Sequence, residues 1–180
     1  LMAELTRIAN HLWALGFLLN DLGALQTPML FFYLERELIL DFFETLAGSR
    51  MMCNYMRFGG VAYDLPDDVR GVPTMEFLHE LIYNNLPRVL DQGDELMTGN
   101  EIVKARSIGV AALSAEDAIA HSATGPLLRA SGVAYDIRRA EPYSYYEHLD
   151  FDIAVRYNGD IYDRYLVRMD EMRQSLRILQ

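Results

Sequence analysis

The sequence predicts a mainly α-helical protein, a bundle of about four long helices with one long irregular insert that contains a short helix and little strand. Apolar residues recur at helical spacing in four long stretches. Capping residues, proline and glycine mark the ends of these stretches. We expect a single domain over residues 1–180, because a chain of this length can bury one core.

The first two helices are expected within residues 1–60. The first covers residues 1–25 and is apolar almost all round, which implies burial on most sides. Thr27-Pro28 combines an N-cap with proline at the first helical position, so the second helix begins there. This helix is expected to end at Gly59-Gly60, although Gly48 offers an earlier break.

Residues 61–73 contain Pro and Gly breaks and are expected to form a loop. A third helix is expected over residues 74–97. Pro87 should kink this helix, because its ring removes a backbone hydrogen bond.

The insert spans residues 99–159 and is too long for an idle connection, so we expect it to carry function or a partner contact. Inside it, Ser114 is expected to cap a short helix, and Phe151 to Arg156 resembles a strand. Asp160 is expected to cap the last helix, within residues 160–180.

Composition excludes several classes of protein. The chain has no apolar run of transmembrane length, and its net charge of -10 argues against binding to nucleic acid or to an anionic membrane surface. Cys53 is the single cysteine, so the chain alone builds no disulfide and no multi-cysteine metal site, and a reducing cytoplasmic setting fits. Helical patterns run to both ends of the sequence, and we therefore expect an internal portion of a longer protein.

Two polar stripes mark the first helix. Asn10, Trp13, Phe17 and Asp21 share one stripe, which could line a cavity for an apolar ligand with a polar head. Spacing alone favours the simpler interpretation, in which the aromatic residues are core and the aspartate is solvated. The other stripe carries a set interpreted as a polar network facing another helix, with no spacing for a metal site: Glu4, Arg7 and His11.

The second helix carries two further sets. One face holds three carboxylates, interpreted as a solvated acidic face: Glu37, Asp41 and Glu44. Arg50, Cys53 and Arg57 form another stripe, and its arginines need an anionic partner. That partner is either an acidic residue of this chain or an anionic cofactor held by a neighbouring protein.

A loop at residues 124–138 holds Arg129, Asp136 and Arg138, which core packing does not require. Its glycines and proline prescribe the backbone closely. The sequence marks this loop as specialised without indicating its role.

Several motifs, in this order, resemble the 49-kDa subunit family of respiratory complex I, the proton-pumping NADH:quinone oxidoreductase. They are Glu4-Leu5-Thr6-Arg7-Ile8-Ala9-Asn10-His11-Leu12, Asp21-Leu22-Gly23-Ala24, Glu35-Arg36-Glu37, Gly48-Ser49-Arg50-Met51, Asn54-Tyr55-Met56-Arg57-Phe58-Gly59-Gly60-Val61, the loop at 124–138 and Asp163-Arg164-Tyr165-Leu166-Val167-Arg168. The family is distantly related to the large subunit of nickel-iron hydrogenases. The lone cysteine argues against a metal-bearing relative of that kind.

The resemblance implies a subunit that binds no cofactor itself and packs against an iron-sulfur subunit, so that the two form a quinone cavity. Asp21 matches the family aspartate that pairs with a head-group histidine lying before residue 1, and Trp13 and Phe17 match cavity-lining positions. Arg50, Met52 and Arg57 match the side that faces the terminal iron-sulfur cluster. Many members have histidine at the position of Met52.

The expected function is therefore the quinone site of a proton-translocating NADH:quinone oxidoreductase, in its peripheral arm on the cytoplasmic face of the cell membrane. Its expected partners are the iron-sulfur subunit, other subunits of complex I and quinone; the fragment alone should be inert. Two alternatives stay open, a helical assembly protein without redox chemistry and the equivalent subunit of a ferredoxin-dependent relative.

Overall fold

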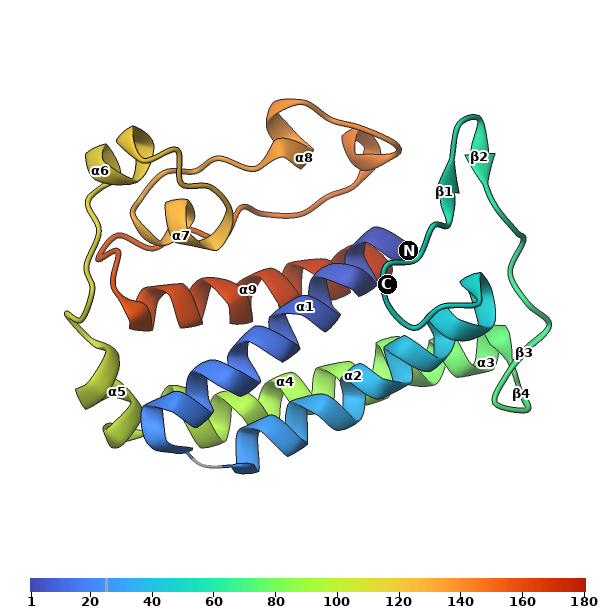
Figure 1. The fold of residues 1–180 in the computed structure, drawn as a ribbon, viewed down its shortest axis with the longest axis horizontal. Helices are drawn as coiled ribbons and strands as arrows, with labels where there is room; N and C mark the ends of the chain where they lie inside the picture. Colours follow the sequence, from blue (N-terminus) through green and yellow to red (C-terminus); the bar gives the residue numbers. More distant parts are fainter. Residues whose placement is uncertain (25) are drawn as a thin grey trace.

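The computed structural model describes residues 1–24 and 26–180, and helices make up most of it (Figure 1). The bundle consists of α1 (Met2–Leu19), α2 (Gln26–Ala47), a helical run over residues 74–98 and α9 (Ile161–Leu179). α1 contacts both α2 and α9, and the helical run contacts the same two helices, so the four enclose one core. The predicted mainly α-helical fold is confirmed.

α1 places a stripe of fully buried residues against its neighbours, including Leu5, Ile8, Leu12 and Leu15. This stripe follows the helical period, so burial of one face stabilises the helix. A π-helical turn, η1 (Asn20–Ala24), follows α1. The opposite side of α1 is left free to line a surface feature.

α2 ends at Ala47, much earlier than predicted. Gly48 follows it with φ of +70°, a left-handed conformation that costs about 1–2 kcal/mol for a residue with a Cβ. Its N–H donates to the carbonyl of Glu44 at 2.8 Å, as at a glycine helix end. The prediction of a helix reaching Gly59-Gly60 is wrong, and Gly48 is the break.

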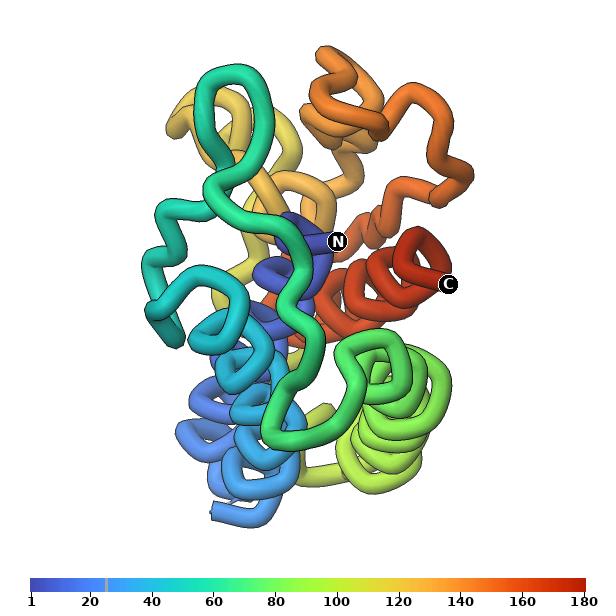
Figure 2. The backbone as a smooth tube through the Cα atoms, turned by 90° about the vertical axis from the view of Figure 1, so that its right-hand side faces the viewer, coloured from blue at the N-terminus to red at the C-terminus, as the bar shows by residue number. Residues whose placement is uncertain are grey.

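Two small antiparallel hairpins follow. β1 (Met56–Arg57) pairs with β2 (Gly60–Val61), and β3 (Asp68–Val69) pairs with β4 (Val72–Pro73). The glycine pair expected to end a helix therefore belongs to a hairpin. Figure 2 shows the β1–β2 hairpin rising above the bundle, apart from the segment around α8.

The predicted third helix is confirmed as one continuous helical run. Its parts are α3 (Thr74–His79), η2 (Glu80–Asn85), α4 (Leu86–Gly93) and η3 (Asp94–Thr98). The N–H of Leu86 donates to the carbonyl of Leu81, five residues back, so a wider π-helical turn precedes Pro87. The proline has no N–H, and this wider turn accommodates it.

The insert is more helical than predicted. It contains α5 (Glu101–Ser107), α6 (Ala115–Ala120), α7 (Gly125–Ala130), α8 (Ile137–Ala140) and the 3-10 turn η4 (Tyr146–His148). Ser114 caps α6 as predicted, because its hydroxyl accepts from the N–H of Asp117 at 3.1 Å.

The predicted strand from Phe151 to Arg156 is wrong, because its backbone donors bond elsewhere. The N–H of Asp152 donates to the side chain of Gln174, and that of Arg156 donates to the carbonyl of Arg129.

α9 begins where the sequence predicts. A carboxylate oxygen of Asp160 accepts from the N–H of Asp163 at 2.8 Å and caps the helix. Within residues 1–24 and 26–180, none of the helices has the length and apolar character needed to cross a membrane.

Candidate functional site

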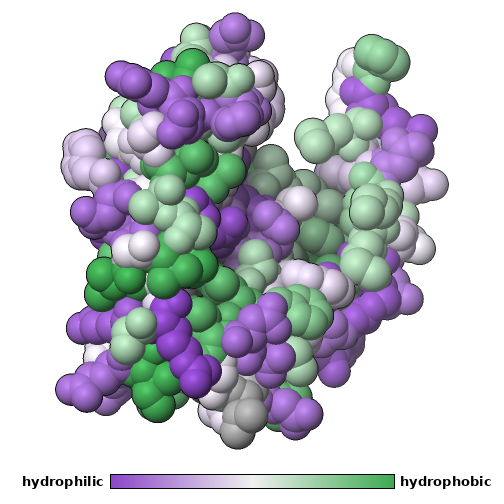
Figure 3. Space-filling model, turned by 60° about the vertical axis from the view of Figure 1, so that its left-hand side comes forward, coloured by the Kyte–Doolittle hydropathy of each residue, from purple (hydrophilic) through white to green (hydrophobic). Residues whose placement is uncertain are grey.

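A groove of about 600 Å³ opens between α1, α2 and the segment that follows Gly48. Its lining is mainly apolar with a few polar groups and includes Asn10, Trp13, Arg36, Phe43, Arg50 and Met52. Figure 3 shows the hollow between the β1–β2 hairpin, at the upper right, and the rest of the molecule. A volume and lining of this kind suit an apolar ligand with a polar head.

Aromatic side chains form one wall of the groove. The ring of Trp13 lies 5.5 Å from that of Phe17 and 5.6 Å from that of Tyr33, measured between centroids. Trp13 and Phe17 are 40% and 42% exposed, so neither is a core residue. The simpler interpretation of this stripe, as core, is therefore wrong, and the two rings are free to meet a ligand or a partner.

Asp21 lies further along the same side of the molecule. It is exposed, in the π-helical turn η1, eight residues beyond Trp13. At 1.5 Å of rise per residue this is about 12 Å along the helix axis. The stripe from Trp13 to Asp21 thus begins in the groove and ends outside it.

Arg50 finds its anionic partners within this chain. Its guanidinium donates to Asp41 at 2.9 Å and to Glu37, and lies 3.7 Å from Glu44. The acidic face of α2 and the arginine that needed an anion therefore satisfy each other. Of the two alternatives for Arg50, the structure favours an acidic residue of this chain.

Arg50, Cys53 and Arg57 do not form a helical stripe, because α2 ends before them. Arg57 lies exposed on β1, and its Nε donates to the carbonyl of Asn54 at 3.1 Å. Met52 is 97% exposed and lines the groove. These side chains form a projecting surface next to the groove instead of one helix face.

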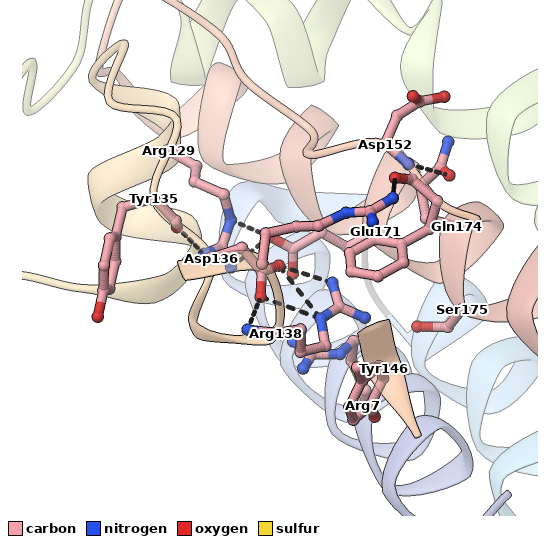
Figure 4. Close-up of polar contacts among 12 residues, drawn as sticks. Arg7, Arg129, Tyr135, Asp136, Arg138, Tyr146, Asp152, Glu171, Gln174 and Ser175 are labelled. Atoms are coloured by element: carbon pink, nitrogen blue, oxygen red, sulfur yellow. Dashed lines mark hydrogen bonds and ion pairs between the residues drawn. The ribbon is translucent and has the colours of Figure 1, made fainter. Parts of the chain in front are cut away.

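A separate buried polar cluster holds the insert on the bundle (Figure 4). Arg138 from α8 donates Nη1 to both carboxylate oxygens of Glu4 at 3.1 Å, and Nη2 to Asp136 at 2.7 Å. Tyr146 and Ser175 also donate to Glu4. Burial alone would raise the pKa of Glu4, but these two hydrogen bonds and the charge of Arg138 together lower it.

The cluster continues along α9. Arg129 donates to Glu171 at 2.6 Å, and the other carboxylate oxygen of Glu171 lies 2.6 Å from Nε2 of His11. Burial lowers the pKa of His11, although its bond to Glu171 opposes this, and the charges of Arg168 and Arg7 lower it further. His11 is therefore neutral at pH 7 and donates to Glu171.

The polar network expected at Glu4, Arg7 and His11 is thus confirmed, and the loop at 124–138 acquires a role. Its arginines and aspartate dock the insert against α1 and α9. Over residues 1–24 and 26–180, no group of three or more His, Cys, Asp or Glu side chains is arranged to hold a metal ion.

Sequence reasoning missed two members of the groove wall, Tyr33 and Arg36. Arg36 lies in the Glu35-Arg36-Glu37 motif, which contributed only to the family resemblance. A guanidinium between two acidic residues has the pattern of an ordinary surface charge. The available signal was its spacing of three from Tyr33, which places both on one face of α2.

The comparisons with known proteins agree with these motifs. Residues 21–180 match the model of the family described as "Respiratory-chain NADH dehydrogenase, 49 Kd subunit". The chain is 56% identical to a D-type subunit of NADH-quinone oxidoreductase from Roseiflexus sp. (strain RS-1), and 52% identical to the D-type subunit from Dehalococcoides mccartyi (strain ATCC BAA-2266 / KCTC 15142 / 195). These matches cover all of this chain but 46% and 47% of those proteins, so the chain spans about half the length of these curated relatives. The chain belongs to the family of the 49-kDa subunit of the respiratory-chain NADH dehydrogenase.

Proposed function

We propose that this chain contributes the quinone site of a proton-translocating NADH:quinone oxidoreductase. Electrons pass from NADH through iron-sulfur clusters to quinone, and this chain forms the quinone cavity together with the iron-sulfur subunit that carries the terminal cluster. The protein works in the peripheral arm on the cytoplasmic face of the membrane, next to other subunits of the complex. It binds no cofactor itself, and quinone is the substrate.

The observation that carries this proposal is the groove. It joins Trp13, expected at the quinone cavity, to Arg50 and Met52, expected on the cluster side. Its aromatic and thioether lining suits an isoprenoid quinone ring, and Asn10 and Arg36 supply polar groups for carbonyl oxygens. Exposed Met52, Met56 and Phe58 beside the groove form an apolar surface of the kind that a partner subunit covers.

The residues of this chain would bind and orient the quinone and exclude water from it. Asp21 would act through a histidine of the full-length protein, because a carboxylate next to a histidine stabilises the protonated ring. A proton held there is available to the reduced quinone. The cluster of the partner subunit supplies the electrons when the complex is assembled.

The test is Asp21→Asn in the intact complex, with quinone reduction and NADH oxidation by an artificial acceptor measured in parallel. We expect quinone reduction to fall at least tenfold, the effect of removing a positioned proton-transfer group, and oxidation with the artificial acceptor to persist. Asp68→Asn, at an exposed position on β3, is the matched control and should change neither activity. Unchanged quinone reduction in Asp21→Asn would remove this residue from the site.

A further inference from the structure

Trp13 is the single tryptophan of the chain, and its ring is held from α2 rather than from its own helix. The ring stacks on Tyr33 at an interplanar angle of 30°. The guanidinium carbon of Arg36 lies 4.3 Å from the centroid of the Trp13 ring. A half-exposed indole that would otherwise move between rotamers is thus fixed from below.

Arg36 also reaches the opposite wall of the groove. Its Nη2 donates to the sulfur of Met51 at 3.5 Å, and its Nη1 lies 3.5 Å from Glu37. One side chain therefore contacts α1, through Trp13, and the segment after Gly48, through Met51.

Surface electrostatics does not explain this placement. Arg36 is 8% exposed, and its Nε is buried without a hydrogen-bond partner among the described residues. Leaving a donor unsatisfied is costly, whereas a desolvated cation gains from lying on the face of an indole. Since the planar guanidinium can stack and donate at its edges simultaneously, arginine suits this position better than lysine.

The geometry points to Arg36 as a positioning residue of the quinone groove, which holds the Trp13 ring and the Met51 segment at the separation that the ligand needs. This inference rests on the proposed function of the groove. Arg36 acts through Trp13, so its loss leaves the ring in place but free to move, and the ligand must then order it on binding. The effect belongs in the KM for quinone rather than in kcat.

The test is a double-mutant cycle in the intact membrane complex, with Arg36→Gln, Trp13→Leu and the double variant. The KM and kcat for quinone are measured, and each rate is normalised to NADH oxidation with ferricyanide, which counts assembled enzyme. We expect Arg36→Gln to raise the KM about three- to tenfold, the range of a desolvated cation–π contact. Arg36→Lys should recover part of that loss, because it keeps the cation. Arg88→Lys is the control, since Arg88 is exposed and pairs with Glu35 at 3.1 Å outside the groove.

The cycle separates the two ideas. We expect Trp13→Leu to raise the KM by itself, and Arg36→Gln to add less than about twofold in that background, because coupled residues are not additive. Additive effects, or an unchanged KM in Arg36→Gln, would overturn the positioning role. An unchanged KM in Trp13→Leu would instead contradict the proposed function of the groove.

Discussion

Arg138 is the residue whose removal should most weaken the attachment of the insert to the bundle. Its side chain is 1% exposed, and its guanidinium pairs with Glu4 on α1 and with Asp136. Arg138→Met keeps an apolar stem against Phe151, over which the guanidinium lies at 4.4 Å, and removes only the charge and its donors. Two buried carboxylates then lose their cation.

The magnitude follows from what each carboxylate keeps. Breaking a buried ion pair from one side costs about 3–5 kcal/mol, because the remaining charge stays desolvated. Glu4 keeps the hydroxyl groups of Tyr146 and Ser175, and Asp136 keeps a backbone N–H. We therefore expect about 3–5 kcal/mol for the whole cluster rather than that amount for each carboxylate.

Hydrogen exchange in the assembled complex, followed by mass spectrometry, measures this loss locally. At about 1.4 kcal/mol per tenfold, amides in α7 and α8 should exchange between about a hundredfold and a few thousandfold faster. Arg177→Met is the matched control, because Arg177 is 47% exposed and pairs with Asp152 at 3.1 Å on the surface. Its effect should stay within about 1 kcal/mol, or roughly fivefold.

Equal exchange in the two variants would refute the reasoning. It would mean that apolar contacts around Phe151 hold the insert and that the ion pairs add nothing. Arg138→Lys offers a further check, since an ammonium cannot reach both carboxylates with the same fork and should give an intermediate rate.

Two other predictions concern pH. The pKa of His11 is lowered in the folded chain from its usual 6.5, so the unfolded chain binds the extra proton first and stability falls as pH drops below about 6.5. The lowered pKa values of Glu4, Asp136 and Glu171 add a second loss as pH falls below about 4.5; denaturant titrations of His11→Gln should lack the first loss and keep the second. Met52 cannot titrate, so the midpoint potential of the neighbouring cluster should be nearly independent of pH between about 6 and 8, and Met52→His should introduce a slope of up to about 59 mV per pH unit. A steep slope in the natural protein would show that another group carries that proton.

The bundle could be predicted because its signals are local. Thr27-Pro28 and Asp160 lie at or next to helix starts in the structure, and the apolar stripe of α1 follows one period. The end of α2 was missed because residues 49–57 continue a helix-compatible pattern. A single left-handed glycine, Gly48, overrides that pattern.

The candidate site was predictable only in part. Trp13 and Phe17 were found from spacing and resemblance, but spacing alone favoured a core role. Arg138 and Glu4 are 134 positions apart, and nothing local to either residue indicates the other. The strand at 151–156 failed for a similar reason, since a strand needs a neighbour that its own sequence does not specify.

The central claim is that quinone binds in the groove beside Trp13. Photolabelling of the intact complex with a photoreactive quinone, followed by peptide mapping, tests it most directly. The account predicts label on the peptides that contain Trp13, Phe17 or Met52, suppressed by excess natural quinone. Label confined to the insert at 99–159, or label on the groove that natural quinone does not suppress, would contradict it.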